Sequence, residues 1–362
     1  TIHTERAKKG LVRGSLLNVL EPSGQRVTPR CEYFGHCGGC HYQHANYEHQ
    51  LAGKVAILRE TLARLGRIDY SDEIAVISGE PWFYRNRIQL HFRNSRSGFH
   101  KQNSHEVQAI NHCYISAPEL VEAIAKFSEA VRRPEWPDFL RSLELFSNGS
   151  ELQLNVLDTN RPVAATFFEW CGTFLPSLVQ GALYYPAAGF RFRISGSSFF
   201  QVNRFLIDAL VEEATAAYSG QHAADVYAGV GLFSIALAKR FTRVDAVERG
   251  ASASRDLEVN VAESRLAIRP FKATAEQYLA STEGNSPDFM LADPPRSGLG
   301  RETVAALLSR KPAYLTLVSC DPATLARDSR LLLTEYRIRR LALVDLFPQT
   351  YHFETVMHLE RR

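Results

Sequence analysis

Three short runs in the second half of this 362-residue chain contain residues that could carry covalent chemistry. Asp293 begins DPPRSGL, Cys320 lies in SCDPATLARD, and Glu354 lies in FPQTYHFETVMHLER. A thiolate can add to a ring carbon and activate its neighbour towards a methyl donor; a base must then remove a proton so that the thiolate leaves. Cys320 suits the thiolate, because a helix predicted to begin at Pro322 would lower the thiol pKa at its N-terminus. Glu354 suits the base.

A glycine-rich turn upstream predicts a ligand pocket for these residues. Taken singly, Cys320 would more often be a small buried residue. However, the run DVYAGVG at 225–231 places Gly229 and Gly231 at the start of a predicted helix, where the backbone can approach a ligand. The next predicted strand ends at Glu248, whose carboxylate could accept hydrogen bonds from both ribose hydroxyls. An NAD site is the alternative, but its third glycine is Ser234 here. The pattern favours S-adenosylmethionine.

The elements that position these residues alternate regularly after residue 195. Strand patterns at 223–227, 243–248, 268–272, 289–292 and 313–319 are separated by helical ones, which predicts a parallel doubly wound α/β sheet. Two strands at 336–347 and 353–360 follow without a helix, so we expect them to pair antiparallel at the sheet's edge. This is the pattern of class I methyltransferases. Because ligand sites gather at the carboxyl ends of such strands, all three runs should face one crevice.

The sequence of the first half of the chain predicts a different pattern of secondary structure. Residues 1–27 contain only short strand-like pieces, at 11–12 and 16–20, and are interpreted as the remnant of a small β-module. Residues 28–194 mix strands and helices in an α+β region, with a helix at 47–65 ending at Gly66 and a hairpin around Asn148-Gly149. Residues 195–362 then form the domain that binds the methyl donor.

Cysteine spacing predicts a metal centre in the α+β region. Cys31, Cys37 and Cys40 are closely spaced, and Cys113 follows in a loop-like context. In a reducing cytosol such a group holds a metal more often than disulfides. Four thiolates suit an iron–sulfur cluster, with tetrahedral zinc as the alternative. Cys171 lies in an apolar helical stretch and is predicted to be core.

Charge distribution is compatible with an RNA partner, although the net charge is only +3. Basic residues crowd the start of the chain and interleave with aromatic ones further on, which suits phosphate contacts and base stacking; these residues are Arg6, Lys8, Lys9 and Arg13, then Trp82, Phe83, Tyr84, Arg85, Arg87, Arg93, Arg96 and Lys101. A solvated charged surface is the alternative. No apolar run approaches the ~18 residues that cross a bilayer, and no signal-peptide core is present. We expect a cytoplasmic protein without a membrane partner.

The three reactive runs resemble those of the RNA (uracil-5-)-methyltransferase family, and the resemblance extends from the cysteines to the C-terminus. It implies methyl transfer from S-adenosylmethionine to carbon 5 of a uridine through a covalent Cys–uracil intermediate. Cys320 would be the nucleophile, Glu354 the base, and Asp293 part of the donor and uracil pocket. The run FFQVN at 199–203 resembles the family's FxQxN, which makes Gln201 a cofactor-pocket residue, and Tyr227 and Glu248 line the adenosine site.

The same resemblance bears on cofactor and substrate. The four cysteines are similar to the [4Fe–4S] site of the iron–sulfur-bearing members, which favours 23S rRNA as target, with the tRNA T-loop uridine as the alternative. No obligate protein partner is implied. The family usually places an Asp after the third strand to hold the adenine amino group, and this chain has ATAE at 273–276, which leaves Thr274 or Glu276 as substitutes.

Two readings compete with the methyltransferase. An iron–sulfur or NAD-linked oxidoreductase would explain the cysteines and the sheet, yet it leaves Cys320 and Glu354 without a role. An RNA-binding module with a degenerate enzyme core is disfavoured, because Cys320, Glu354, Asp293 and Gln201 are all present.

Overall fold

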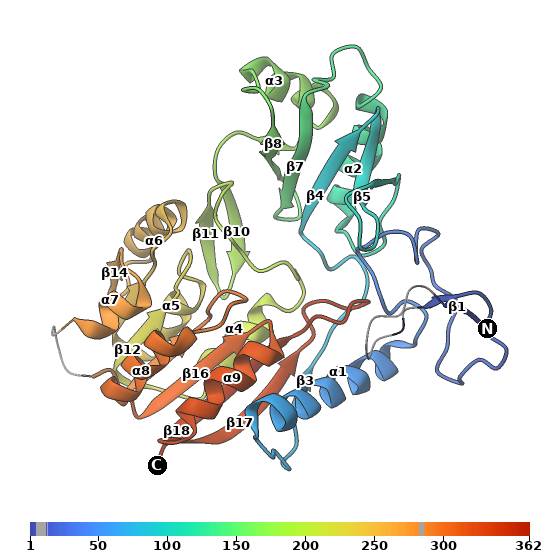
Figure 1. Cartoon of the computed structure of the whole chain (residues 1–362). Helices are drawn as coiled ribbons and strands as arrows, with labels where there is room; N and C mark the ends of the chain where they lie inside the picture. The colour runs from blue at the N-terminus through green and yellow to red at the C-terminus, as the bar shows by residue number, and fades with distance from the viewer. Residues whose placement is uncertain (5–11, 13, 282–285) are drawn as a thin grey trace.

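A large sheet forms the centre of the second half of the molecule (Figure 1). The computed structural model describes residues 1–4, 12, 14–281 and 286–362. Among these, the eight strands of this sheet lie in the order β14 (Ile268–Phe271), β13 (Phe241–Val247), β12 (Gly220–Val226), β15 (Phe289–Ala292), β16 (Tyr314–Ser319), β18 (Glu354–Arg361), β17 (Tyr336–Val344) and β3 (Ala75–Ile77). The first five run parallel, as the alternation predicts.

The last strands of the sheet differ from the prediction in one respect. β18 pairs antiparallel with β16 and with β17, as expected. However, this hairpin is not the edge of the sheet, because β3 pairs in parallel with β17 beyond it. β3 comes from the α+β region of the sequence, and its contribution could not be anticipated from three residues whose partner lies more than 260 positions away.

Helices cover both faces of this sheet, which explains why its central strands are buried throughout. Apolar residues of α4 (Ile207–Thr215), α5 (Leu232–Leu237) and α6 (Ala251–Ser264) pack in one core cluster. Those of α1 (Tyr47–Thr61), α7 (Ala275–Ala280), α8 (Gly300–Arg310) and α9 (Pro322–Leu332) pack in a second cluster on the other side. The fold is therefore the three-layered α/β arrangement of class I methyltransferases.

A second sheet, of six strands, belongs to the α+β region and lies in the upper half of Figure 1. Its order is β6 (Val107–Ala109), β5 (Arg96–His100), β4 (Arg87–Arg93), β7 (Leu140–Ser147), β8 (Leu152–Thr159) and β9 (Leu178–Val179). Its apolar residues share a core with those of α2 (Pro118–Ala130) and α3 (Ala165–Phe174). β7 and β8 form the hairpin predicted around Asn148-Gly149, and Cys171 is fully buried in α3, as predicted.

The remaining elements are small. β10 (Leu183–Ala187) and β11 (Phe190–Ile194) form a hairpin between the two large sheets, and β1 (Ile2–Thr4) pairs with β2 (Gly14–Leu16) at the beginning of the chain. The basic residues predicted there, Arg6, Lys8, Lys9 and Arg13, lie outside the described residues, as does Leu11. Val12 and residues 17–20 are described but belong to no strand. Among the described residues, no helix is both long and apolar enough to span a bilayer.

The helix predicted at 47–65 ends differently from the expectation. α1 continues as a π-helical turn, Leu62–Gly66, and the left-handed residue that ends it is Arg67. Gly66 has another role. A Cβ at this position would approach the carbonyl of Ala326 in α9 to 3.0 Å. The glycine is therefore required by close packing of the two helices, because a larger residue would push them apart.

Candidate active site

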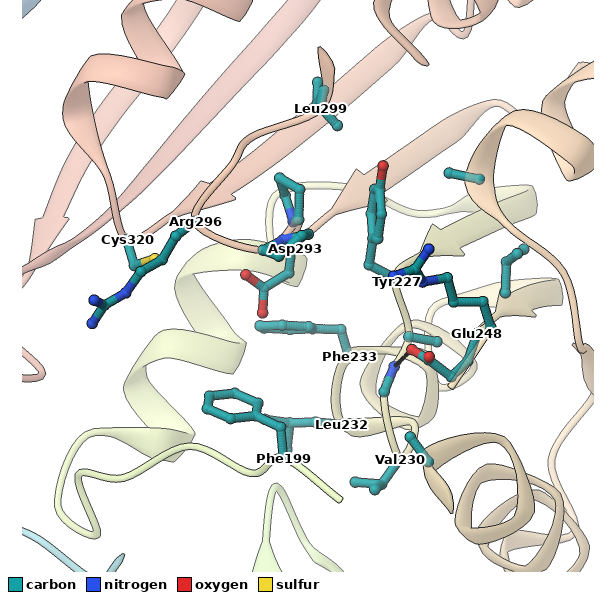
Figure 2. A pocket seen from close by; sticks show the side chains of 18 of the residues that line it. Phe199, Tyr227, Val230, Leu232, Phe233, Glu248, Asp293, Arg296, Leu299 and Cys320 are labelled. Carbon is teal, nitrogen blue, oxygen red and sulfur yellow. Dashed lines mark hydrogen bonds between the residues drawn. The ribbon is translucent and has the colours of Figure 1, made fainter. Parts of the chain in front are cut away.

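A cavity of about 710 Å³ opens at the carboxyl ends of the parallel strands (Figure 2). Its lining includes every predicted catalytic residue and all but one predicted cofactor-pocket residue; these are Cys320, Glu354, Asp293, Gln201, Tyr227, Gly229 and Glu248. Residues from six separate parts of the sequence thus meet in one place. The crevice inferred from strand order is present.

Cys320 follows the last residue of β16 and precedes α9. The thiol is half-buried, and its pKa is raised to about 11, first by burial and then by the negative charges of Glu354 and Asp293. Arg296 acts in the opposite direction. The prediction of a lowered pKa is wrong, because burial and the charges of Glu354 and Asp293 outweigh Arg296. Asp321 caps the helix with its own carboxylate, which accepts hydrogen bonds from Ala323 N and Thr324 N. The first N–H groups are thus already satisfied by a negative charge.

Two carboxyl groups at the cavity, the buried Glu354 and the half-buried Asp293, lie close enough to influence each other. Glu354 begins β18, and its pKa is raised well above the usual value, first by burial and then by the charge of Asp293. Asp293 follows β15, and burial together with the charge of Asp225 raises its pKa to about 7. Arg296 lowers the pKa of Glu354. Such perturbed carboxyl groups in a cavity are typical of sites that transfer protons near neutral pH.

Arg296 is a site residue that the sequence analysis did not single out. It lines the cavity, and Figure 2 shows its side chain beside the sulfur of Cys320. It is the cation that faces the thiol and the carboxyl of Glu354. Its position in DPPRSGL, three residues after Asp293, was the available signal. Arginine can stabilise a developing thiolate or an oxyanion, because its charge persists at all working pH values.

The glycine turn has the shape that a nucleoside ligand needs. Gly229 adopts a φ of 56°, and a Cβ there would meet no atom within 4 Å, so the turn faces open space. Tyr227 has a φ of 90°, a region that residues with a side chain rarely adopt. Glu248 accepts hydrogen bonds from Gly229 N (3.0 Å) and Gly250 N (2.5 Å), which fixes its carboxylate at the cavity wall (Figure 2).

Gly231 is the one predicted pocket residue that does not line the cavity. It caps α5 with a φ of 97°, and a Cβ there would approach the Leu257 side chain to 2.9 Å. Its role is therefore in the turn and its packing. Ser234, which replaces the third glycine of an NAD fingerprint, donates a hydrogen bond to the buried Asp225 (2.6 Å). This contact explains the substitution, since a glycine could not hold that carboxyl group.

The two candidates for the adenine contact both line the cavity, but they are engaged differently. Thr274 caps α7, and its hydroxyl accepts a hydrogen bond from Gln277 N (3.2 Å). Glu276 accepts a hydrogen bond from the hydroxyl of Thr303. A carboxylate has about four acceptor positions. Glu276 therefore keeps acceptor capacity towards the cavity, whereas the Thr274 hydroxyl is used in the helix cap.

An aromatic residue at the entrance was also not assigned by sequence reasoning. Phe199 is 63% exposed although it precedes the buried Phe200 and Gln201. It lines the cavity on the side opposite Asp293 (Figure 2). A large apolar side chain exposed in a site is suited to stacking on a flat ring. It belongs to the FFQVN run, where the pattern identified Gln201 alone.

The four predicted metal ligands line a second cavity, of about 590 Å³. Cys31, Cys37, Cys40 and Cys113 are all free thiols. Burial and the neighbouring thiols raise the pKa of Cys37 to about 11 and that of Cys40 to about 12. Among the described residues, no group of three or more cysteine, histidine or acidic side chains is arranged to hold a metal ion. The four thiols therefore share one cavity, but among the described residues they are not arranged as a metal site.

The basic and aromatic stretch at 82–101 divides between core and surface. Tyr84 is fully buried, and Arg87 is buried beside Glu144 (3.5 Å) and the ring of Phe146, so the predicted RNA contacts at these two positions are wrong. Tyr84 donates a hydrogen bond to the carbonyl of Pro348 (3.1 Å), and Arg87 donates one to the carbonyl of Ser198 (2.9 Å). The three outer cations, Arg93, Arg96 and Lys101, are exposed. Trp82 and Phe83 are half-buried, and together with Tyr114 they surround the guanidinium of Arg30.

Fold and site together define the class of protein. A doubly wound sheet, a glycine turn at the end of its first strand and a carboxylate at the end of the next form the adenosine pocket of a class I S-adenosylmethionine-dependent methyltransferase. The chain matches the family model "tRNA (Uracil-5-)-methyltransferase" over residues 177–362. It is 32% identical to an RNA methyltransferase of Aquifex aeolicus, over 98% of this chain and 89% of the other.

Two further relatives carry more specific names. The chain is 32% identical to the 23S rRNA (uracil(1939)-C(5))-methyltransferase of Shewanella amazonensis, over 96% of this chain and 85% of the relative. The crystal structure of Pyrococcus abyssi tRNA (uracil-54, C5)-methyltransferase with S-adenosyl-L-homocysteine matches with a TM-score of 0.75 and 26% identity, over 99% of this chain and 91% of the other. The chain belongs to the RNA (uracil-5-)-methyltransferase family and is an S-adenosylmethionine-dependent enzyme that methylates carbon 5 of uracil in RNA.

Proposed function

We propose that the target is one specific uridine of 23S rRNA, with the tRNA T-loop uridine as the second candidate. Support for ribosomal RNA comes from the four cysteines around one cavity and from several relatives named as 23S rRNA enzymes. The tRNA candidate is supported by the P. abyssi structure. Either substrate places the enzyme in the cytoplasm. Exposed cations Arg93, Arg96 and Lys101 and the aromatic cluster around Arg30 are the proposed RNA contacts.

The observation that carries the mechanism is that Cys320, Glu354 and Asp293 line the same cavity as the glycine turn. The thiol of Cys320 first loses its proton to solvent. The thiolate then attacks carbon 6 of the flipped uracil, and the electron pair of the ring double bond moves to the carbonyl oxygen. Arg296 stabilises the thiolate beforehand, and Asp293 holds the polar edge of the ring. S-adenosylmethionine, when bound against Tyr227, Gly229 and Glu248, supplies an electrophilic methyl group.

The second half of the reaction belongs to Glu354. After carbon 5 has accepted the methyl group, Glu354 removes the remaining proton from that carbon. The electron pair of the broken C–H bond restores the ring double bond, the bond between carbon 6 and sulfur breaks, and Cys320 leaves as a thiolate. A buried carboxyl with a raised pKa is a stronger base than an exposed one, because it holds the abstracted proton more tightly. Gln201 and Glu276 complete the donor pocket.

A [4Fe–4S] cluster bound by Cys31, Cys37, Cys40 and Cys113 is part of the proposal. Four thiols around one cavity, with no disulfide between them, form a suitable ligand set. The proposed division of the chain follows from it. Residues 1–27 are the remnant of an RNA-binding β-module, residues 28–194 bind the cluster, and residues 195–362 bind the methyl donor. The middle part contributes α1 and β3 to the layers of the large sheet.

The test uses the purified enzyme with 23S rRNA and tRNA transcripts and maps 5-methyluridine by mass spectrometry. We expect one methylated position in 23S rRNA and none in tRNA. Cys320→Ala should abolish turnover, and Glu354→Gln should accumulate a methylated covalent protein–RNA adduct, because the proton is no longer removed. Substantial methylation by Cys320→Ala would rule out the covalent route. Modification of tRNA alone would replace the first target by the second.

A further inference from the structure

One segment, residues 345–353 between β17 and β18, contributes to both cavities. Phe347 and the adjoining Glu354 line the active site, whereas Tyr351 and His352 line the cysteine cavity. In Figure 1 this red segment extends beyond the sheet towards the blue chain that leads into α1. A displacement of the segment at the cysteine side would therefore reach the base within a few residues.

Gln349 is the point at which the cysteine loop holds this segment. Its carbonyl accepts hydrogen bonds from His41 N (2.8 Å) and Tyr42 N (2.9 Å), the two residues that follow Cys40. Gln349 is 3% exposed and adopts a φ of 67°, a conformation that residues with a side chain rarely adopt. Such a conformation persists only where the surroundings impose it. Here the cysteine loop supplies part of that constraint.

Gln50 of α1 supplies the rest of the constraint on Gln349. Its side chain donates to the Gln349 side chain (3.0 Å) and accepts from Gln349 N (3.1 Å). The side-chain nitrogen of Gln50, whose two N–H groups are shared among three acceptors, also lies within hydrogen-bond distance of the carbonyls of Tyr42 (3.1 Å) and Ala45 (2.9 Å). One buried side chain thus holds the cysteine loop and the base-bearing segment together. The ring of His41 also packs on Tyr351, with 4.5 Å between centroids.

The segment is anchored at its other end as well. Lys54, also in α1, donates to Asp345 (2.6 Å) and to the carbonyl of Phe347 (3.0 Å), and both charged groups are fully buried. The hydroxyl of the buried Tyr84 donates to the carbonyl of Pro348 (3.1 Å). With residues 345–348 fixed in this way, the part that responds to the cysteine loop is the short stretch from Gln349 to Phe353, directly before Glu354.

We propose that Gln50 and Gln349 are positioning residues that set the location of Glu354 according to the arrangement of the cysteine loop. The inference rests on the proposed role of Glu354 as base. A break in the link between the cysteine loop and Glu354 should affect one step, the removal of the carbon 5 proton. If the link is broken, Cys320 still adds to carbon 6 and the methyl group is still transferred, but the carbon 5 proton remains on the ring because the carboxylate is misplaced. The bond between sulfur and carbon 6 then persists, and the methylated adduct accumulates.

The first experiment measures the fraction of enzyme trapped as methylated adduct in single turnover, with Glu354→Gln as the reference. In Gln50→Leu we expect adduct release to slow roughly tenfold to a hundredfold, because misplacement of a reacting group by about 1 Å has effects of this size. In Gln349→Gly, which tolerates the positive φ, adduct release should also slow, but by a smaller factor. Gln153→Leu is the matched control. It removes an equally buried amide that donates to the carbonyls of Gly181 (2.7 Å) and Ile194 (3.1 Å), far from this segment in the sequence.

The outcomes distinguish the assignment of Glu354 as base from the positioning role of Gln50 and Gln349. If Glu354→Gln itself traps no adduct, the assignment of the base fails. If Glu354→Gln traps adduct while Gln50→Leu and Gln349→Gly release product at the wild-type rate, the base stands and the positioning role is overturned. A general loss of folded protein would lower the rates of adduct formation and adduct release together. The control variant Gln153→Leu would then show the same decrease.

The second experiment tests the link between the cysteine loop and residues 349–353 without measuring activity. In Cys40→Ser we expect faster hydrogen exchange at the amides of residues 41–42 and 349–353, because the loop that holds Gln349 is loosened. Cys171→Ser, which changes a fully buried cysteine of α3, should leave these amides unchanged. Unaltered exchange at 349–353 in Cys40→Ser would show that the cysteine loop does not control the segment.

Discussion

Cys320 and Glu354 each lie one residue beyond the last pair of the antiparallel ladder between β16 and β18. That ladder ends with Ser319 opposite Thr355, and Glu354 is close enough for its charge to raise the pKa of the Cys320 thiol. The group proposed to attack carbon 6 and the group proposed to deprotonate carbon 5 are therefore brought to the same end of two neighbouring strands.

The first prediction concerns the ionisation of Cys320. Because burial and then Glu354 raise its pKa to about 11, the thiolate fraction at neutral pH is small, and alkylation by iodoacetamide should increase with pH up to about 11. Glu354→Gln should move the midpoint to lower pH by removing a negative neighbour, and Arg296→Met should move it higher. Mass spectrometry of the Cys320 peptide measures both. A midpoint near 9 that neither variant shifts would contradict this electrostatic description.

The second prediction concerns the methyl donor. Glu248→Gln removes the negative charge that would accept the ribose hydroxyls, and hydrogen bonds to a charged group contribute about 1.5–3 kcal/mol. We expect the dissociation constant for S-adenosylmethionine, measured by calorimetry, to rise roughly tenfold or more. Glu258→Gln on the exposed side of α6 is the control and should bind normally. Equal affinity in Glu248→Gln would place the ribose elsewhere.

The third prediction concerns stability. Lys54→Met leaves the carboxylate of Asp345 buried without its cation, and loss of one partner of a buried pair typically costs about 3–5 kcal/mol. Denaturant unfolding should show a decrease of this size in the free energy of unfolding. The double variant Lys54→Met/Asp345→Leu should recover much of it, because no uncompensated charge remains. A single variant as stable as the wild type would mean that Tyr47, which donates to Asp345 (2.9 Å), is a sufficient partner.

The fourth prediction concerns the cysteine cavity. Anaerobically purified protein should contain about four iron and four sulfide per chain, with broad visible absorption, and Cys37→Ser should lose most of both. Cys171→Ser should retain them, since that thiol lies in the core of the six-stranded sheet and its helices. Elemental analysis that finds zinc in place of iron would favour a tetrahedral zinc site instead.

The sequence predicted what depends on periodicity and on local chemistry. Strand and helix alternation located the large sheet, and strand ends located Cys320, Asp293 and Glu248 on one cavity. What it missed depends on contacts between distant segments. Arg87 was predicted to be a surface cation, but in β4 it is buried and lies opposite Phe146 of β7. The partners of Gln349 lie about 300 positions away in the chain, and no pattern around it could indicate them.

The thiol of Cys320 illustrates a different limit. A helix was correctly predicted after it, and the general effect of a helix N-terminus was correctly stated. The sign of the pKa shift was nevertheless wrong, because the thiol is partly buried and the carboxyl groups of Glu354 and Asp293 lie nearby. Electrostatics at a site depends on the sum of all neighbours, which sequence proximity does not supply.

The insertion of β18 between β16 and β17 has a consequence for how the enzyme matures. Both neighbours are synthesised earlier, and neither can pair with the other across the gap, so each exposes an open edge until the later strand emerges and fills it. The residue that begins this strand is Glu354. The proposed base is therefore put in place only when this last strand completes the sheet.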